Sequence, residues 1–91
     1  MNKPGFREVF SRIKAYQNEL FHTKTGLKFS YSIDGNGFYP SRTTYRISIS
    51  NIKKAYELVP FEGPGVVNAI VRGPAYLWAV LHDPRIRENN W

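Results

Sequence analysis

The sequence predicts an α+β fold, in which several helices accompany one antiparallel β-hairpin, and three observations support this prediction. Apolar residues recur at helical spacing between Pro4 and His22, and residues 27 to 33 alternate strictly between apolar and polar side chains. The segment GPGVVNAIVRGPAYLWAVLHDP, residues 63 to 84, contains two Gly-Pro units of similar pattern. Helical and strand periods therefore occupy separate parts of one short chain.

The first expected element is a long helix from Pro4 to His22. Its apolar residues follow the i, i+3, i+4, i+7 spacing of one helical face, and only Gln17 is out of step. Arg7 and Lys14 share the opposite stripe without an acidic partner, so their charge is directed to solvent or to a ligand. The apolar face consists of Phe6, Val9, Phe10, Ile13, Leu20 and Phe21.

An antiparallel hairpin is expected next, because two alternating stretches flank the turn sequence DGNG at 34 to 37. The first strand, residues 27 to 33, directs four residues inward: Leu27, Phe29, Tyr31 and Ile33. The second strand, residues 38 to 48, continues the alternation with another inward set: Tyr39, Thr43, Tyr45 and Ile47. Pro40 cannot donate a backbone hydrogen bond, so the start of this strand is predicted to lie at a sheet edge.

A short helix is predicted after the hairpin. Ser48 or Ser50 can cap it, and with Ser48 as the cap Ile47 and Ile52 would pack as a hydrophobic staple. The inward face continues through Tyr56 and Val59, and Pro60 ends the helix.

The two Gly-Pro units predict two further helices of about two turns each, both packed on the hairpin. Pro64 and Pro74 each suit the first position of a helix, where the missing N–H leaves nothing unsatisfied. Residues 66 to 71 could also form a strand, because a short apolar run has no diagnostic period. Pro84 discourages continuation of the second helix.

Residues 1 to 91 are too few to form two independent cores, so one small globular domain is expected. Residues 86 to 91 are a candidate flexible tail, and Trp91 either docks on the body or stays free for a partner. The predicted core consists of Phe10, Ile13, Phe29, Tyr31, Ile47, Val67, Ile70, Leu77 and Val80.

Composition excludes several classes of protein. The chain has no cysteine, so neither a disulfide framework nor a thiolate metal site is possible. Apolar runs are too short for a membrane span and no signal peptide is recognisable, so a cytoplasmic protein without a membrane partner is expected. No motif for a metal, a nucleotide cofactor or an activated nucleophile occurs. We therefore expect no cofactor and no metal, and we favour a binding function over catalysis.

The excess of basic residues points to a polyanionic partner. Lys and Arg total 13 against 7 Asp and Glu, giving a net charge of +6. Residues 1 to 28 contribute +4, residues 29 to 60 contribute +2, and the remainder is neutral. Such a field attracts nucleic acid or an acidic protein surface.

The predicted binding site is the outward face of the hairpin. Lys28, Arg42 and Arg46 alternate there with serine and threonine hydroxyls, a composition that contacts phosphates. Phe38 is expected to stack on a base at the turn, and the cations of the first helix assist. Arg72 beside the second Gly-Pro unit is a candidate anion-binding residue. A register slip of one residue would turn this face inward.

Two other functions remain open. The basic face could dock on an acidic partner as a protein-interaction or inhibitor module. A metal-independent ribonuclease would need a base, an acid and a cation near the phosphate, and its candidates are Arg42, Arg46, Tyr45 and one of the two histidines. The sequence sets neither an oligomeric state nor a preference between DNA and RNA.

Overall fold

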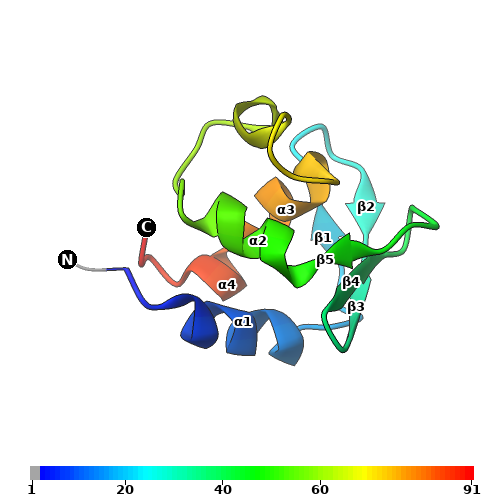
Figure 1. Cartoon of the computed structure of the whole chain (residues 1–91), viewed down its shortest axis with the longest axis horizontal. Helices are drawn as coiled ribbons and strands as arrows, with labels where there is room; N and C mark the ends of the chain where they lie inside the picture. Colours follow the sequence, from blue (N-terminus) through cyan, green and yellow to red (C-terminus); the bar gives the residue numbers. More distant parts are fainter. Residues whose placement is uncertain (1–2) are drawn as a thin grey trace.

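The computed structural model describes residues 3 to 91 and confirms the α+β class, with helices packed against two small antiparallel sheets (Figure 1). One sheet pairs β1 with β2, and the other has the order β3-β4-β5. In chain order the elements are α1 (Phe6–Ala15), β1 (Phe21–His22), β2 (Lys28–Phe29), β3 (Tyr31–Asp34), β4 (Gly37–Pro40), β5 (Ile47–Ser48), α2 (Ile49–Tyr56), η1 (Pro64–Val67), α3 (Pro74–Leu81) and α4 (Pro84–Arg87).

The helix α1 is shorter than the sequence predicts, because it ends at Ala15 rather than at His22. Asn18 has a left-handed backbone with φ of 68°, and its N–H donates to the carbonyl of Tyr31 at 2.8 Å. Gln17, the residue out of step with the helical period, accepts a hydrogen bond from the N–H of Ile33 at 2.7 Å. The chain therefore leaves the helix at Gln17 and enters β1, where Phe21 is buried as a strand residue.

The predicted first strand is divided between the two sheets. Phe29 pairs with Phe21 in one sheet, whereas Tyr31 pairs with Pro40 in the other. The inward assignment of Phe29 and Tyr31 is confirmed, since both are buried, but Leu27 is 49% exposed and its assignment is wrong. The strand begins only at Lys28, because Leu27 belongs to the turn between β1 and β2, where it exchanges hydrogen bonds with Thr23.

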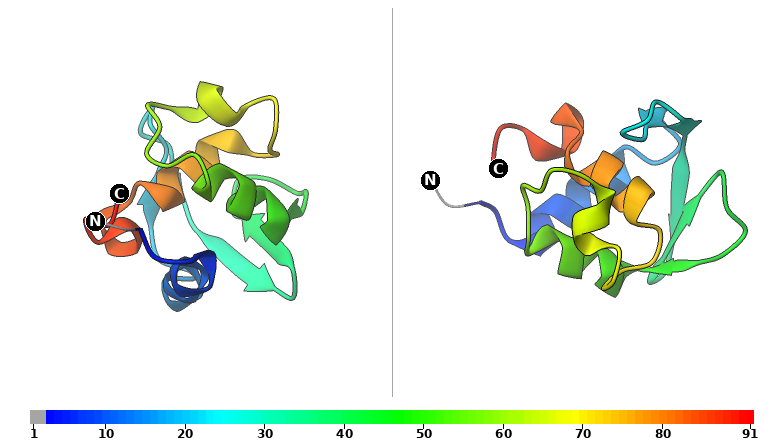
Figure 2. Two further views of the ribbon diagram at one scale, coloured as in Figure 1. Left: turned by 60° about the vertical axis from the view of Figure 1, so that its left-hand side comes forward. Right: turned by 90° about the horizontal axis from the view of Figure 1, so that it is seen from above.

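The predicted second strand is also broken, and in β4 the inward positions are shifted by one residue, whereas Ile47 in β5 is buried as predicted. β4 ends at Pro40, a six-residue loop follows, and β5 returns to pair Ile47 with Phe38. Phe38 is fully buried and stacks on the Tyr31 ring at 4.8 Å, so it points inward where the sequence assigned Tyr39. The loop, residues 41 to 46, projects at the right-hand edge of the molecule in Figure 1 and in the right panel of Figure 2.

The predicted capping of α2 is confirmed. The side chain of Ser48 accepts a hydrogen bond from the N–H of Ser50 at 3.3 Å. Ile47 and Ile52 are both buried, as the hydrophobic staple requires, and Tyr56 and Val59 continue the inward face.

The two Gly-Pro units differ in structure although their sequences are similar. Pro74 begins the α-helix α3, which lies at the centre of the molecule behind α2 (Figure 1). Pro64 begins only a 3₁₀ turn, η1, so residues 66 to 71 form neither a two-turn helix nor a strand. Val67 is buried as predicted, but Ile70 is 49% exposed, so its assignment to the core is wrong, and the neighbouring Val71 is buried instead.

Pro84 opens a further helix, α4, which the sequence analysis did not predict. The carboxylate of Asp83 caps it by accepting from the N–H of Arg85 at 2.9 Å. Ile86 is fully buried, and the indole N–H of Trp91 donates to the carbonyl of Leu81 at 2.8 Å. Trp91 is thus docked on the body of the protein, its ring edge-on to that of Tyr56.

The core joins α1, the sheets and α3 around Tyr31. Its hydroxyl donates to the carbonyl of Ile13 in α1 at 2.6 Å, and its ring lies between those of Phe21 and Phe38. Phe10, expected in the core, packs against it but stays half-buried. Within residues 3 to 91, no helix is long and apolar enough to cross a membrane.

Candidate functional site

The cations that the sequence placed on a flat sheet face lie instead on and around the loop 41 to 46. This loop, SRTTYR, contains two arginines, an exposed tyrosine and no acidic residue. Phe38 in β4 and Ile47 in β5 pair with each other and are both buried in the core. The loop that joins these two strands therefore projects away from the core. We call the residues Lys28, Arg42, Tyr45, Arg46 and Arg72 the basic loop surface.

At one end of the basic loop surface, Arg42 reaches across to β2. Its guanidinium donates to the carbonyl of Lys28 at 3.3 Å, which brings two predicted site residues together. The strand register places His22 directly opposite Lys28, and both residues are exposed. Three basic or titratable side chains therefore share this end of the surface.

Arg46 lies over the outer side of β4. A Cβ built on Gly37 would lie 2.9 Å from the Arg46 Nε and 2.7 Å from a ring carbon of Tyr39, so both side chains cover the glycine. Gly37 allows this approach because it has no side chain. Asp34 stands opposite Gly37 in the register, which puts one acidic residue at the border of the basic loop surface.

Arg72 joins the surface from the segment that precedes α3. Its guanidinium carbon lies 4.8 Å from the centroid of the Tyr45 ring, within cation–π distance. Its backbone N–H donates to the side chain of Asn51 in α2 at 3.1 Å, and this bond fixes the position of the segment. Sequence reasoning missed the pairing of Tyr45 with Arg72, because it assigned Tyr45 to the inward side of a strand.

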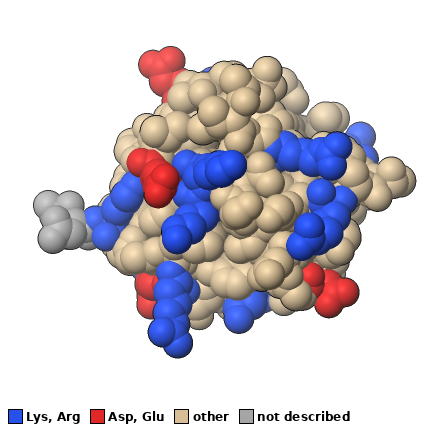
Figure 3. Space-filling view, viewed as in Figure 1, with Lys and Arg blue, Asp and Glu red and all other residues tan. Residues whose placement is uncertain are grey.

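Ion pairing distinguishes the basic loop surface from the other end of the protein. The ion pairs within residues 3 to 91 join Arg12 to Glu8 and Glu88, and Arg85 to Asp83, all on α1 or near α4. The cations of the loop have no such partner in the described chain. Figure 3 shows Lys and Arg side chains spread over the face that carries α2 and β5, with few acidic groups among them.

The remaining predicted site residues lie elsewhere. Phe38 is buried, so the prediction that it stacks on a base at the surface is wrong, and the one-residue register shift is the reason. Arg7 and Lys14 are exposed on α1, along the lower edge of Figure 1 and away from the loop. Lys14 there lies 5.1 Å from the Phe10 ring.

The two histidines have different surroundings. His82 accepts a hydrogen bond from the N–H of Phe61 at 3.1 Å through Nε2, so its proton resides on Nδ1, which donates to the carbonyl of Trp78 at 2.9 Å. Burial lowers the pKa of His82 from its ordinary value of 6.5, and the charge of Arg87 lowers it further, whereas the bond to Trp78 opposes this shift. With both nitrogens occupied, His82 has no free site for acid–base chemistry.

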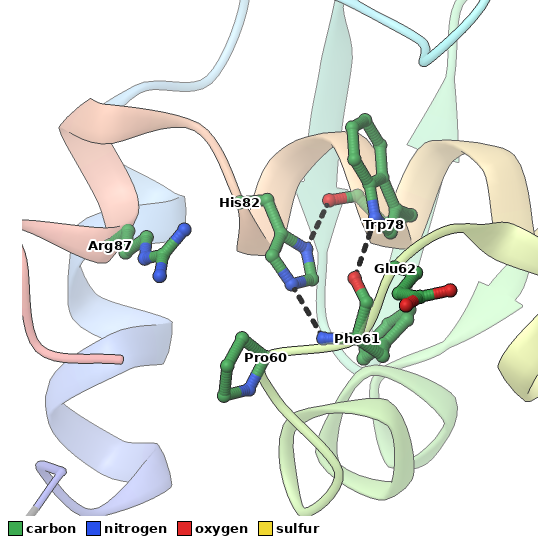
Figure 4. A pocket seen from close by; sticks show the side chains of 6 residues that line it. All are labelled: Pro60, Phe61, Glu62, Trp78, His82 and Arg87. Carbon is green, nitrogen blue, oxygen red and sulfur yellow. Dashed lines mark hydrogen bonds between the residues drawn. The ribbon is translucent and has the colours of Figure 1, made fainter.

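A cavity of about 490 Å³ lies beside His82, at the far end of α3 from the Gly73 turn (Figure 4). The loop after α2 forms one side of it, and α3 and α4 form the other. Its lining residues are Pro60, Phe61, Glu62, Trp78, His82 and Arg87.

Within residues 3 to 91, no group of three or more His, Asp or Glu side chains is placed to hold a metal ion. Comparison with models of known protein families, with curated proteins and with solved structures finds no match for this chain.

Proposed function

We propose that this chain binds nucleic acid through the basic loop surface. The observation that carries the proposal is the contact of Arg72 with the Tyr45 ring. Arg46 follows Tyr45 in the loop, and within residues 3 to 91 none of the cations of this surface forms an ion pair. Cations without acidic partners release counterions when they contact phosphates, and an exposed aromatic ring beside them offers a stacking platform for a base.

The ends of the surface extend this argument. Lys28 and Arg42 supply two further positive charges, and the Arg42 guanidinium is bonded to the backbone carbonyl of Lys28. Thr43 and Thr44 lie between Arg42 and Arg46 in the sequence, and Ser41 precedes Arg42. Hydroxyls and guanidinium groups together are the side chains that most often contact the phosphate backbone. The lack of cysteine fits the reducing cytoplasm, where we propose that the chain meets its ligand.

Fluorescence anisotropy across a salt series tests the proposal, with labelled single-stranded DNA, single-stranded RNA and duplex DNA as probes. If the four cations of the basic loop surface each contact one phosphate, the slope of log K against log salt should be about −2.8 for a single strand. Arg42→Gln/Arg46→Gln should reduce that slope by about 1.4, because two phosphate contacts are lost.

The matched variant Arg7→Gln/Lys14→Gln removes the same charge from α1. We expect it to lower affinity by less than about threefold, because only the long-range field changes. Circular dichroism should show that both variants are folded. Equal losses in the two variants, or no binding to any probe at low salt, would contradict the proposal and favour the acidic protein partner.

A further inference from the structure

We propose that the cavity beside His82 binds a small, flat aromatic compound that carries a carboxylate group. Its volume of about 490 Å³ lies within the range of about 300 to 1,000 Å³ that is typical of small-molecule sites. The site is separate from the basic loop surface and does not depend on the proposed nucleic-acid binding.

The cavity wall favours a flat ring. The rings of Trp78 and His82 lie nearly parallel, with 19° between their planes and 5.3 Å between their centroids. Phe61 meets His82 edge-on at 85° and 4.8 Å. Figure 4 shows these three side chains, with Pro60, grouped along the opening. A ligand ring can stack on such a surface or meet it edge-on.

The polar atoms of this wall are already used within the protein. The indole N–H of Trp78 donates to the carbonyl of Phe61 at 3.1 Å, and both nitrogens of His82 are bonded to the backbone of Phe61 and Trp78. The wall therefore presents ring surfaces without a free donor or acceptor. An apolar ring such as phenyl or indole fits it better than a polar nucleobase, whose edge would lose its hydrogen bonds to water.

Arg87 supplies the charge for the carboxylate. Its guanidinium points toward His82 across the opening (Figure 4). Its Nε donates to the carbonyl of Trp91, and within residues 3 to 91 its two terminal nitrogens make no hydrogen bond. A guanidinium with free terminal nitrogens pairs with a carboxylate through parallel N–H···O bonds.

The second cation near the opening is Lys24. Its ammonium donates to the backbone carbonyl of Glu62 at 2.7 Å and lies 5.9 Å from the Trp78 ring. The Glu62 carboxylate, on the side of the cavity opposite Arg87, is the one acidic group in the lining. The lining itself holds one cation, Arg87, and one anion, Glu62, on opposite sides, so the end of the cavity at Arg87 is the one that favours an anionic group.

A titration of the ¹⁵N-labelled protein with indole-3-acetate, followed by two-dimensional NMR, tests this proposal. We expect saturable shifts of the amide signals of residues 60 to 62, 78, 82 and 87. The uncharged indole-3-acetamide should bind about tenfold more weakly, since it lacks the charge-assisted pair. Arg87→Gln should remove this difference between the two compounds.

A second variant, Glu62→Gln, tests the same proposal if Arg87→Gln disturbs the packing of Trp91. The Glu62 side chain is exposed, and its replacement should tighten indole-3-acetate binding by about twofold to threefold, because a nearby like charge is removed. Asp34→Asn, with the same change of charge in the hairpin, should leave the affinity unchanged. Equal affinity for the acid and the amide, absence of saturation, or shifts scattered over the protein would overturn the proposal.

Discussion

Some single residues connect separate elements of this fold, and His82 is one whose hydrogen bonds depend on pH. It connects the loop after α2 to the end of α3, because the same ring accepts from Phe61 and donates to Trp78. A protonated imidazole has two donors and no acceptor, so protonation must break the bond from Phe61. Its environment therefore favours the neutral ring.

The pH dependence of stability should follow from His82. Its pKa is lowered on folding, so the unfolded chain binds the proton more readily. The contribution is complete above the ordinary value of 6.5 and is lost as the pH falls through the folded value. Urea unfolding should give a lower free energy of unfolding at about pH 5 than at about pH 7.5. This difference should shrink in His82→Gln and persist in His22→Gln; an unchanged difference in His82→Gln would refute the assignment.

Gly73 is a second residue on which the fold depends, because the turn into α3 requires a residue with a left-handed backbone conformation. Its φ is 62°, and an added Cβ would lie 2.4 Å from the Cδ1 atom of Ile47. Gly73→Ala should therefore destabilise the protein by about 2 to 4 kcal/mol, as strain and overpacking add together. Gly65→Ala is the control, because a Cβ there meets nothing within 4 Å. Denaturation midpoints that are equal for the two variants would contradict this packing.

At the scale of elements, local signals predicted helix starts better than they predicted strands. The start of α2 follows from Ser48, whose side chain accepts from the N–H of Ser50, and the start of α3 follows from Pro74, whose ring fixes its own φ. Both starts were predicted. The divided strands were not, since pairing with partners distant in sequence decides where a strand ends. The alternation of apolar and polar residues continued through the loop 41 to 46 by coincidence. The sequence Pro-Ser-Arg-Thr-Thr, which begins at the last residue of β4, also carried a turn signal.

The cap of α2 gives a prediction at this scale. Ser48→Ala removes the acceptor for the Ser50 N–H and should lower the free energy of unfolding by about 1 kcal/mol. Ser11→Ala, at an exposed position inside α1, should be neutral or slightly stabilising, since alanine is the better helix former. Equal effects of the two substitutions in chemical denaturation would show that the cap contributes nothing.

For the whole molecule, the distribution of charge is uneven in space as well as in sequence. Acidic side chains pair with arginines on α1 and near α4, whereas the cations of the basic loop surface have no such partner among the residues that the structure describes. The sequence predicted that Lys28, Arg42 and Arg46 act together, and the structure does bring Arg42 to Lys28. It did not predict the contact of Arg72 with Tyr45, because the two residues lie 27 positions apart and only the tertiary structure, including the bond from the Arg72 N–H to Asn51 in α2, brings them together.

Asp34, the acidic residue at the border of the basic loop surface, gives a prediction in which a substitution strengthens binding. Asp34 stands opposite Gly37 in the strand register, and the Arg46 side chain covers Gly37. Asp34→Asn removes a negative charge from the path of a phosphate and should strengthen binding to a single-stranded oligonucleotide about twofold to threefold at low salt. The same gain should vanish in Arg46→Gln if the two side chains act on the same phosphate, which anisotropy titrations of the single and double variants would measure.

The most direct test of the proposed function is the footprint of a short single-stranded oligonucleotide on the amide signals of the ¹⁵N-labelled protein. Binding through the basic loop surface predicts that the largest shifts occur at Lys28, at residues 39 to 46 and at Arg72, with α1 unaffected. Shifts centred on Arg7 and Lys14, or no shifts at low salt, would contradict it.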